Sequence, residues 1–225
     1  MLSRRSQGSR RTNPAVAGLL LGLLAILVLA LIAWSTTWFD EDFEDSSGGW
    51  FVGLDTTGRG NWRISNGHYE VIMLQRDSLS RSLSPSAESI EPPFRLETTL
   101  RTMGGSPGEA GLVYACIAKD GKEEYRTFGV FADGSYRLGR ILRGQLEDLP
   151  VATAPRMFRT HGSNTLRIEA DGDTIRFYGN GLLLATLAEE GLQSSGEVGL
   201  FARSETETFF VARFDSVILS LPENE

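Results

Sequence analysis

The sequence predicts an all-β protein, a two-sheet antiparallel jelly-roll sandwich, preceded by a single transmembrane α-helix. Three observations support this fold class: an uncharged apolar segment of 20 residues, apolar residues at every second position through the rest of the chain, and five Asn-Gly or Asp-Gly pairs between the alternating runs. Alternation with a period of two is typical of half-buried strands, and these pairs are typical of tight hairpins. A chain of 225 residues has room for one such domain and an appendage.

The apolar segment comprises residues 15–34, AVAGLLLGLLAILVLALIAW, and carries no charge. As a helix it is about 30 Å long, which matches the hydrocarbon layer of a bilayer. Four arginines precede it and an acidic run follows it, so the positive-inside rule predicts a cytoplasmic amino terminus. A cleavable signal peptide is the alternative, but its apolar region is usually shorter, and Leu31 and Ala33 make a poor cleavage site.

The expected organisation follows from this segment. Residues 1–14 form a basic cytoplasmic arm, 15–34 the transmembrane helix, 35–39 a short linker, 40–221 the β-sandwich and 222–225 a C-terminal tail. The predicted location is the cell membrane, with a single pass and an extracytoplasmic C-terminal domain.

Charge and cysteine content restrict the partners of the outer domain. After residue 34 the chain has 18 Lys and Arg against 29 Asp and Glu, a formal net charge of −11. Such a charge argues against nucleic acid and anionic lipid head groups as partners. Cys116 is the single cysteine, so no disulfide can form within the chain. Its surroundings, GLVYACIA, indicate a buried strand and a packing thiol.

The clearest alternating run is FRLETTLRTM, in which Phe94, Leu96, Thr98 and Leu100 share one face. Such a run is typical of a half-buried antiparallel strand. Similar strands are predicted for HYEVIML, AGLVYACIA, EYRTFGVF, SYRLGRIL, NTLRIEA, DTIRFYGN, LLLATL, GEVGLFA and FFVARFDSVILS. The expected turns are Asn66-Gly67, Asp120-Gly121, Asp133-Gly134, Asp171-Gly172 and Asn180-Gly181. Residues 77–93 are expected to be a long connection that contains one edge strand.

Two blocks of the sequence carry a resemblance to a known family. They are FDEDFEDSSGGW followed by WRISNGHYEV, and NTLRIEADGDTIRFYGNGLLLATLAEEGLQSSGEVGLFARSETETFFVARFDSVIL. The chain resembles the concanavalin A-like lectin/glucanase superfamily, in particular its laminin-G-like and 3-keto-disaccharide-hydrolase-like domains. This resemblance implies a jelly roll with one concave face, at which relatives bind glycans or proteins, and some members are glycoside hydrolases.

No catalytic residues are predicted. A glucanase of this superfamily has Glu-x-Asp-x-Glu or Glu-x-Asp-x-x-Glu along one strand. The nearest approach is Glu169-Ala-Asp171-Gly-Asp173, which a hairpin turn is expected to interrupt. GGSPG at 104–108 matches a nucleophile elbow formally, but Pro107 lacks the N–H that this motif requires. The sequence also has neither a zinc motif nor a nucleotide-binding loop.

Glycan binding has stronger support from the sequence, because aromatic rings stack on sugars while arginines donate hydrogen bonds to hydroxyl groups. The candidate ligand-binding residues lie in the middle strands, with one tryptophan at the rim of the concave sheet: Tyr114, Tyr125, Arg126, Tyr136, Arg140 and Trp62. The alternative is that these aromatic side chains fill the core or its edges.

Calcium is the one cofactor that the resemblance suggests. Members of the superfamily often hold a structural Ca²⁺ where the first and last strands meet, and Asp42, Glu44 and Asp215 occupy the matching positions. The alternative is an acidic edge strand that discourages aggregation.

The predicted function is therefore a membrane-anchored, extracytoplasmic β-sandwich that binds a glycan or a cell-surface protein without catalysis. One alternative is a cell-envelope glycoside hydrolase or lyase of the same superfamily. Another is a structural or assembly module.

Overall fold

The computed structural model describes residues 37–44, 48–86, 89–103, 107–119, 122–142, 145–148, 157–160, 162–188, 195–206 and 209–222. The chain divides into two compact units, Met1–Thr37 and Trp38–Glu225. The predicted cytoplasmic arm and transmembrane helix lie outside the described residues. Within the described ranges there is no helix that is long and apolar enough to cross a membrane.

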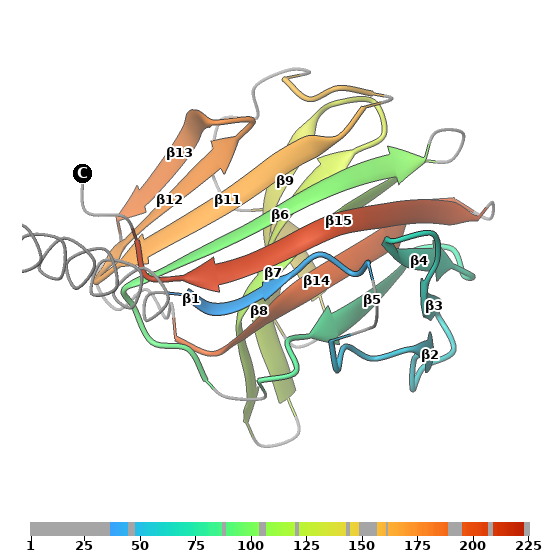
Figure 1. Cartoon of the computed structure of the whole chain (residues 1–225), viewed down its shortest axis with the longest axis horizontal. Helices are drawn as coiled ribbons and strands as arrows, with labels where there is room; N and C mark the ends of the chain where they lie inside the picture. The colour runs from blue at the N-terminus through green and yellow to red at the C-terminus, as the bar shows by residue number, and fades with distance from the viewer. Residues whose placement is uncertain are drawn as a thin grey trace, which may run out of the picture. The chain divides into compact units, whose positions relative to one another are not determined.

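The unit Trp38–Glu225 is a sandwich of two sheets (Figure 1). The nine-stranded sheet has the order β13 (Leu182–Ala188), β12 (Thr174–Gly179), β11 (Asn164–Asp171), β6 (Phe94–Met103), β15 (Phe210–Ser220), β4 (Tyr69–Met73), β3 (Gly60–Ile64) and β2 (Gly53–Leu54), and β1 (Thr37–Glu41) also pairs with β15. The six-stranded sheet has the order β10 (Gln145–Asp148), β9 (Tyr136–Leu142), β8 (Lys122–Phe131), β7 (Gly108–Lys119), β14 (Glu197–Ser204) and β5 (Ser78–Leu83). Both sheets are antiparallel, which confirms the predicted fold class for this unit.

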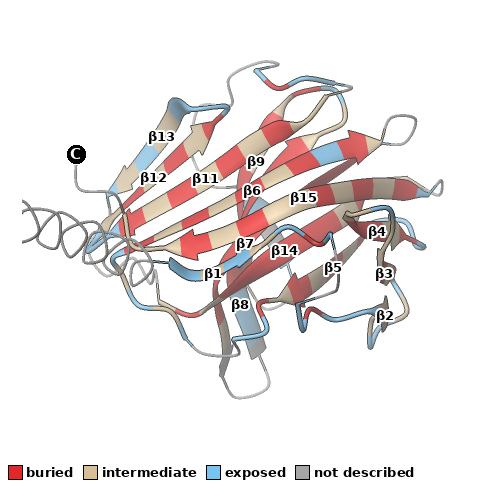
Figure 2. Ribbon diagram, viewed as in Figure 1, coloured by how far each residue is buried: buried red, intermediate tan, exposed pale blue. Residues whose placement is uncertain are grey.

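The core lies between the two sheets and is built by alternation along the strands. In β6 the predicted face of Phe94, Leu96, Thr98 and Leu100 is buried, and the intervening side chains are partly exposed. The same alternation of buried and intermediate residues runs along β11 and β15 (Figure 2). Burial of apolar surface at about 25 cal/mol per Å² is what holds such a sandwich together.

The turns agree with the predicted chemistry where the structure describes them. Asn66 and Gly67 have φ of 53° and 71°, and Asn180 and Gly181 have φ of 50° and 82°. Gly134 and Gly172 also have positive φ, whereas Asp120-Gly121 lies outside the described residues. The predicted edge strand within residues 77–93 is β5, at the edge of the six-stranded sheet.

The acidic run near the amino terminus is divided between a strand and a turn. Strand β1 begins at Thr37, inside the predicted linker, and ends at Glu41. It pairs with the last strand, β15, as the resemblance implied. The chain then turns at Phe43, which has a φ of 59° and packs into the core with its ring 5.0 Å from that of Tyr69. The strand therefore ends where this aromatic side chain must enter the interior.

Candidate functional site

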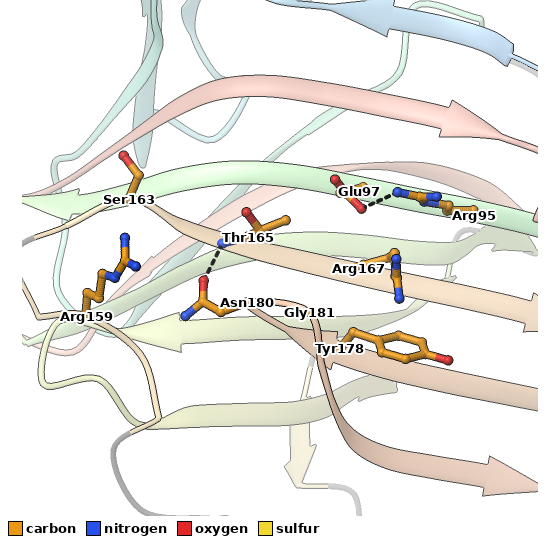
Figure 3. A pocket seen from close by; sticks show the side chains of 9 residues that line it. All are labelled: Arg95, Glu97, Arg159, Ser163, Thr165, Arg167, Tyr178, Asn180 and Gly181. Carbon is orange, nitrogen blue, oxygen red and sulfur yellow. Dashed lines mark hydrogen bonds and ion pairs between the residues drawn. The ribbon is translucent and has the colours of Figure 1, made fainter. Parts of the chain in front are cut away.

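An open pocket of about 500 Å³ lies on the outer face of the nine-stranded sheet (Figure 3). Its lining comes from strands β6, β11 and β12 and from the segments that lead into and out of them: Arg95, Glu97, Arg159, Ser163, Thr165, Arg167, Tyr178, Asn180 and Gly181. The volume is in the range of about 300–1,000 Å³ that is usual for small-molecule sites.

The strand register explains why these side chains converge. Arg167 of β11 pairs with Glu97 of β6 on one side and with Tyr178 of β12 on the other. The flanking residues Leu166 and Ile168 are buried, so this row of three points away from the core. Three strands thus place one guanidinium group, one carboxylate and one aromatic ring side by side.

Close contacts order the half of the pocket that contains Tyr178. The Arg167 guanidinium carbon lies 4.1 Å from the centre of the Tyr178 ring, a cation–π arrangement. Arg167 Nε lies 3.2 Å from Glu169 Oε1, and Arg95 donates a hydrogen bond of 2.8 Å to Glu97 Oε2. Burial and the adjacent Glu169 carboxylate raise the pKa of Tyr178, which keeps its hydroxyl protonated.

A buried asparagine, Asn164, holds the backbone at the other end of the pocket in place. Asn164 is 1% exposed, and its Nδ2 donates to the carbonyl groups of Arg159 and Gly162 at 2.9 and 3.2 Å. Its Oδ1 accepts from the Arg159 backbone N at 2.9 Å and from Asn180 Nδ2 at 3.1 Å. Asn180 Oδ1 in turn accepts from the Thr165 backbone N at 3.0 Å. One side chain therefore fixes both loops at this end of the pocket.

Phe158 anchors the segment that carries Arg159. The Phe158 ring is buried, and the Phe158 backbone N–H donates a hydrogen bond of 3.1 Å to the Gly134 carbonyl. A Cβ at Gly179 would lie 2.3 Å from Phe158 Cζ, so only glycine at that position leaves room for the ring. Arg159 itself is exposed and lies at the end of the pocket opposite to Tyr178 (Figure 3).

The lining has an excess of positive charge. It contains Arg95, Arg159 and Arg167 but only one carboxylate, Glu97. Among the described residues, no carboxylate lies at ion-pair distance from the Arg159 guanidinium. Guanidinium, amide and hydroxyl groups together offer both donors and acceptors, which is the chemistry needed to bind a polyhydroxylated ligand.

Three of the predicted ligand-binding aromatics lie in the core. Trp62, Tyr114 and Tyr136 are fully or almost fully buried. Trp62 stacks on Tyr69 at 5.0 Å and donates to Ser80 Oγ at 2.8 Å, and Tyr136 packs against Phe158 at 6.0 Å. These rings fill the interior, as the alternative interpretation held, and they present no free face to a ligand.

The other three predicted residues belong to the six-stranded sheet. Tyr125 is 7% exposed and lies on its outer face, covered by the Arg81 guanidinium at 4.7 Å. Arg126 pairs in register with Tyr114 and with Arg140, and Arg140 donates to Glu147 Oε2 at 2.6 Å. None of the six lines the pocket. The sequence signal that would have found the pocket is the set of polar residues that alternate with apolar ones in NTLRIEA, DTIRFYGN and FRLETTLRTM.

The outer face of the six-stranded sheet holds a buried carboxylate, Glu109 on β7. It is 1% exposed, with Oε1 at 3.2 Å from Arg137 Nη1 and 3.5 Å from Arg203 Nη1. Burial raises the pKa of Glu109 to about 7, although both arginines act to lower it. Two and four positions further along β7 stand Gly111 and Val113, so the strand has one carboxylate where the glucanase pattern needs more. In Glu169-Ala-Asp171-Gly-Asp173, Gly172 has a positive φ and forms the expected hairpin after Asp171.

Two of the three predicted calcium ligands, Asp42 and Asp215, have carboxylates with other neighbours. Asp215 has Oδ1 3.0 Å from His68 Nδ1, and its Oδ2 accepts a hydrogen bond of 3.2 Å from Ser163 Oγ. Asp42 Oδ1 accepts from the Glu44 backbone N at 3.1 Å. Within the described ranges, no three His, Cys, Asp or Glu side chains come together as a metal site.

Fold and site together define an antiparallel two-sheet β-sandwich with a polar, basic pocket on one outer face. No family model and no curated protein sequence matches the chain. Among solved structures it is similar to the carbohydrate-binding module CBM66 from Bacillus subtilis, with 20% identity, a TM-score of 0.58, and coverage of 76% of this chain and 95% of that one.

Two further similar structures are a Bacillus subtilis protein of unknown function with a galectin-like fold and a Bacillus licheniformis β-glucanase. The first is 13% identical with a TM-score of 0.62, and the similarity covers 83% of this chain and 96% of that one. The second is 11% identical with a TM-score of 0.60, covering 83% and 99%. Identities of this size establish the shared fold and leave the activity to the site.

Proposed function

We propose that this protein is a glycan-binding domain without catalytic activity of its own, held at the outer face of a cell membrane by the apolar segment 15–34. The observation that carries the proposal is the pocket on β6, β11 and β12, where a row of polar side chains faces outward from a rigid sheet. A protein that binds on a sheet loses little conformational entropy, because the sheet already holds its side chains in place.

The chemistry of the pocket suits a saccharide. Glu97 and Asn180 oxygens accept hydrogen bonds from sugar hydroxyls, while the Arg167 guanidinium and the Asn180 amide donate to them. Tyr178 acts mainly through Arg167, because its ring supports the guanidinium and keeps its plane in place.

Two facts outside the pocket support this function. The fold is shared with a carbohydrate-binding module and with glycosidases, so glycan recognition is known on this scaffold. The arginines before residue 15 and the acidic residues after residue 34 favour an orientation that places the domain outside the cell.

A glycosidase is the second candidate, and Glu109 is the observation that favours it. A buried carboxyl group with a pKa of about 7 is about half protonated at neutral pH, and a pKa near the working pH suits a general acid. Glycoside hydrolysis also needs a second carboxylate. The neighbouring Glu205 carboxylate is at ion-pair distance from Arg137 and Arg203, the same two arginines that face Glu109.

A glycan array probed with the full chain in detergent tests the proposal. We expect saturable binding that falls at least about tenfold in Arg167→Ala, because the loss of one charged hydrogen-bonding group costs about 1.5–3 kcal/mol. Arg59→Ala is the matched control, since Arg59 is an exposed arginine on the β2–β3 turn, outside the lining. Unchanged affinity in Arg167→Ala would refute this site, and release of reducing sugar that stops in Glu109→Gln would favour the glycosidase instead.

Membrane anchoring has its own test. In cells that produce the full chain, we expect the protein to stay in the membrane pellet after alkaline carbonate extraction. Protease added outside the cell membrane should remove the sandwich. Recovery of the intact chain in the soluble fraction would contradict the anchor without affecting the glycan site.

A further inference from the structure

We propose that the glycan carries an acidic group, a carboxylate or a sulfate, which Arg159 binds at its end of the pocket. This inference rests on the proposed glycan-binding function and adds the chemical class of the ligand. It begins from a contrast in charge. The domain as a whole carries −11 after residue 34, whereas the pocket lining has three arginines and one glutamate.

The three arginines are not equivalent. Arg95 donates to Glu97, and Arg167 lies at ion-pair distance from Glu169 and over the Tyr178 ring. Arg159 has neither kind of contact: within the described part of the chain its guanidinium has no ion pair and no ring beneath it. The local surplus of positive charge is therefore concentrated at Arg159.

Arg159 is also held in a defined place. Its backbone N–H and C=O are both hydrogen-bonded to the buried Asn164 side chain, at 2.9 Å each. The preceding residue, Phe158, is locked into the core between Tyr136 and Gly179. An exposed cation on a backbone that is fixed on both sides is typical of a binding group that is ordered before its ligand arrives.

The identity of the side chain indicates an oxyanion. The planar guanidinium donates two parallel hydrogen bonds to a carboxylate or a sulfate and remains charged at every physiological pH. A neutral sugar would gain only ordinary hydrogen bonds there. An acidic domain repels anions at long range, so an anionic ligand needs such a local group to bind at all.

The test uses pairs of glycans that differ only in charge. Oligogalacturonides are compared with their carboxyl-reduced forms, and sulfated galactan oligosaccharides with their desulfated forms, by calorimetry on the full chain in detergent. We expect at least one acidic member to bind at least about tenfold more tightly than its neutral form at low salt, and to lose most of this advantage near 1 M salt.

Variants then assign the effect to Arg159. Arg159→Ala should remove about tenfold of the affinity for the acidic member and leave the neutral form within about twofold. Arg159→Lys should give an intermediate loss, because an ammonium group cannot form the paired contact. The control Arg59→Ala should change neither.

Each result supports or overturns the inference that the glycan is acidic. Preference for the carboxylated or for the sulfated pair supports the inference and identifies the oxyanion. Equal binding of acidic and neutral forms, or an equal loss for both in Arg159→Ala, overturns the acidic class while glycan binding stands. No binding of any glycan by the wild-type chain overturns both proposals.

Discussion

The guanidinium carbon of Arg167 lies 4.1 Å from the centre of the Tyr178 ring, across the register pair that joins β11 to β12. This contact fixes the plane of the one arginine at the centre of the pocket. Cation–π contacts at partly exposed sites contribute about 0.5–1 kcal/mol, and more when they are desolvated.

The first prediction separates the ring from its hydroxyl group. Tyr178→Phe keeps the aromatic face beneath Arg167, so we expect glycan affinity to remain within about threefold of wild type. Tyr178→Ala removes the support and should weaken binding about tenfold, which corresponds to about 1.4 kcal/mol. Calorimetry on both variants checks this order, and an equal loss in both would mean that the hydroxyl itself contacts the ligand.

The second prediction concerns the buried Asn164. In Asn164→Ala the partners on Arg159, Gly162 and Asn180 lose their hydrogen bonds together. We expect the free energy of unfolding to fall by about 2–3 kcal/mol, because each buried polar group left without a partner costs about 1–3 kcal/mol. Urea denaturation of the full chain measures this. Asn61→Ala is the control, since Asn61 makes no side-chain hydrogen bond among the described residues. An equal loss of unfolding free energy in Asn61→Ala would contradict the special role of Asn164.

The third prediction links packing to the site. In Gly179→Ala the new methyl group would lie 2.3 Å from Phe158 Cζ, and the ring that anchors the Arg159 segment would have to move. We expect a loss of about 1–3 kcal/mol in stability together with weaker binding of acidic glycans. Phe158→Leu should make Gly179→Ala less costly, so the two effects should not add in a double-mutant cycle. Strict additivity would show that the two residues do not contact one another.

The sequence predicted the sandwich well because most strands have one buried face. In β6 and β11 every second residue enters the core, and this alternation can be read directly. Periodicity alone did not give the bounds of β1, which begins at Thr37 and ends at Glu41, just before Phe43 enters the core. The short strands β2 and β10 have too few residues to show any period.

The site was harder to predict because it depends on register between distant segments. Arg167, Glu97 and Tyr178 become neighbours only when β11 pairs with both β6 and β12. The sequence favoured Trp62, Tyr114 and Tyr136 because their residue types suit sugar binding, but large aromatic rings also have the most apolar surface to bury. The same residue types suit a core and a binding face, and a single sequence does not separate the two.

The fourth prediction concerns calcium. Both oxygens of Asp215 already have partners, His68 and Ser163, and Asp42 accepts a backbone hydrogen bond in its own turn. We expect the melting temperature of the full chain to stay within about 1 °C when EDTA is replaced by millimolar Ca²⁺, since a ligand stabilises only in proportion to its binding to the folded state. A rise of several degrees that disappears in Asp215→Asn would support the calcium site that the sequence resemblance implied.

The fifth prediction uses the raised pKa of Glu109. Burial lifts this pKa from its ordinary 4.5 to about 7, so the fold favours the protonated carboxyl group. The stability that the protonated Glu109 carboxyl group contributes is fully present below about pH 4.5 and is lost as the pH rises through about 7.

Glu109→Gln is a neutral isostere that does not titrate. Relative to this variant, the wild-type chain should lose up to about 3 kcal/mol of unfolding free energy between pH 4.5 and pH 8. Urea denaturation of both chains across this range measures the difference. Glu197→Gln, a change of a partly exposed carboxylate on β14, serves as the control and should follow the wild-type profile. If the wild-type chain instead gains stability over the variant as the pH rises, Arg137 and Arg203 outweigh burial and hold Glu109 as a buried anion.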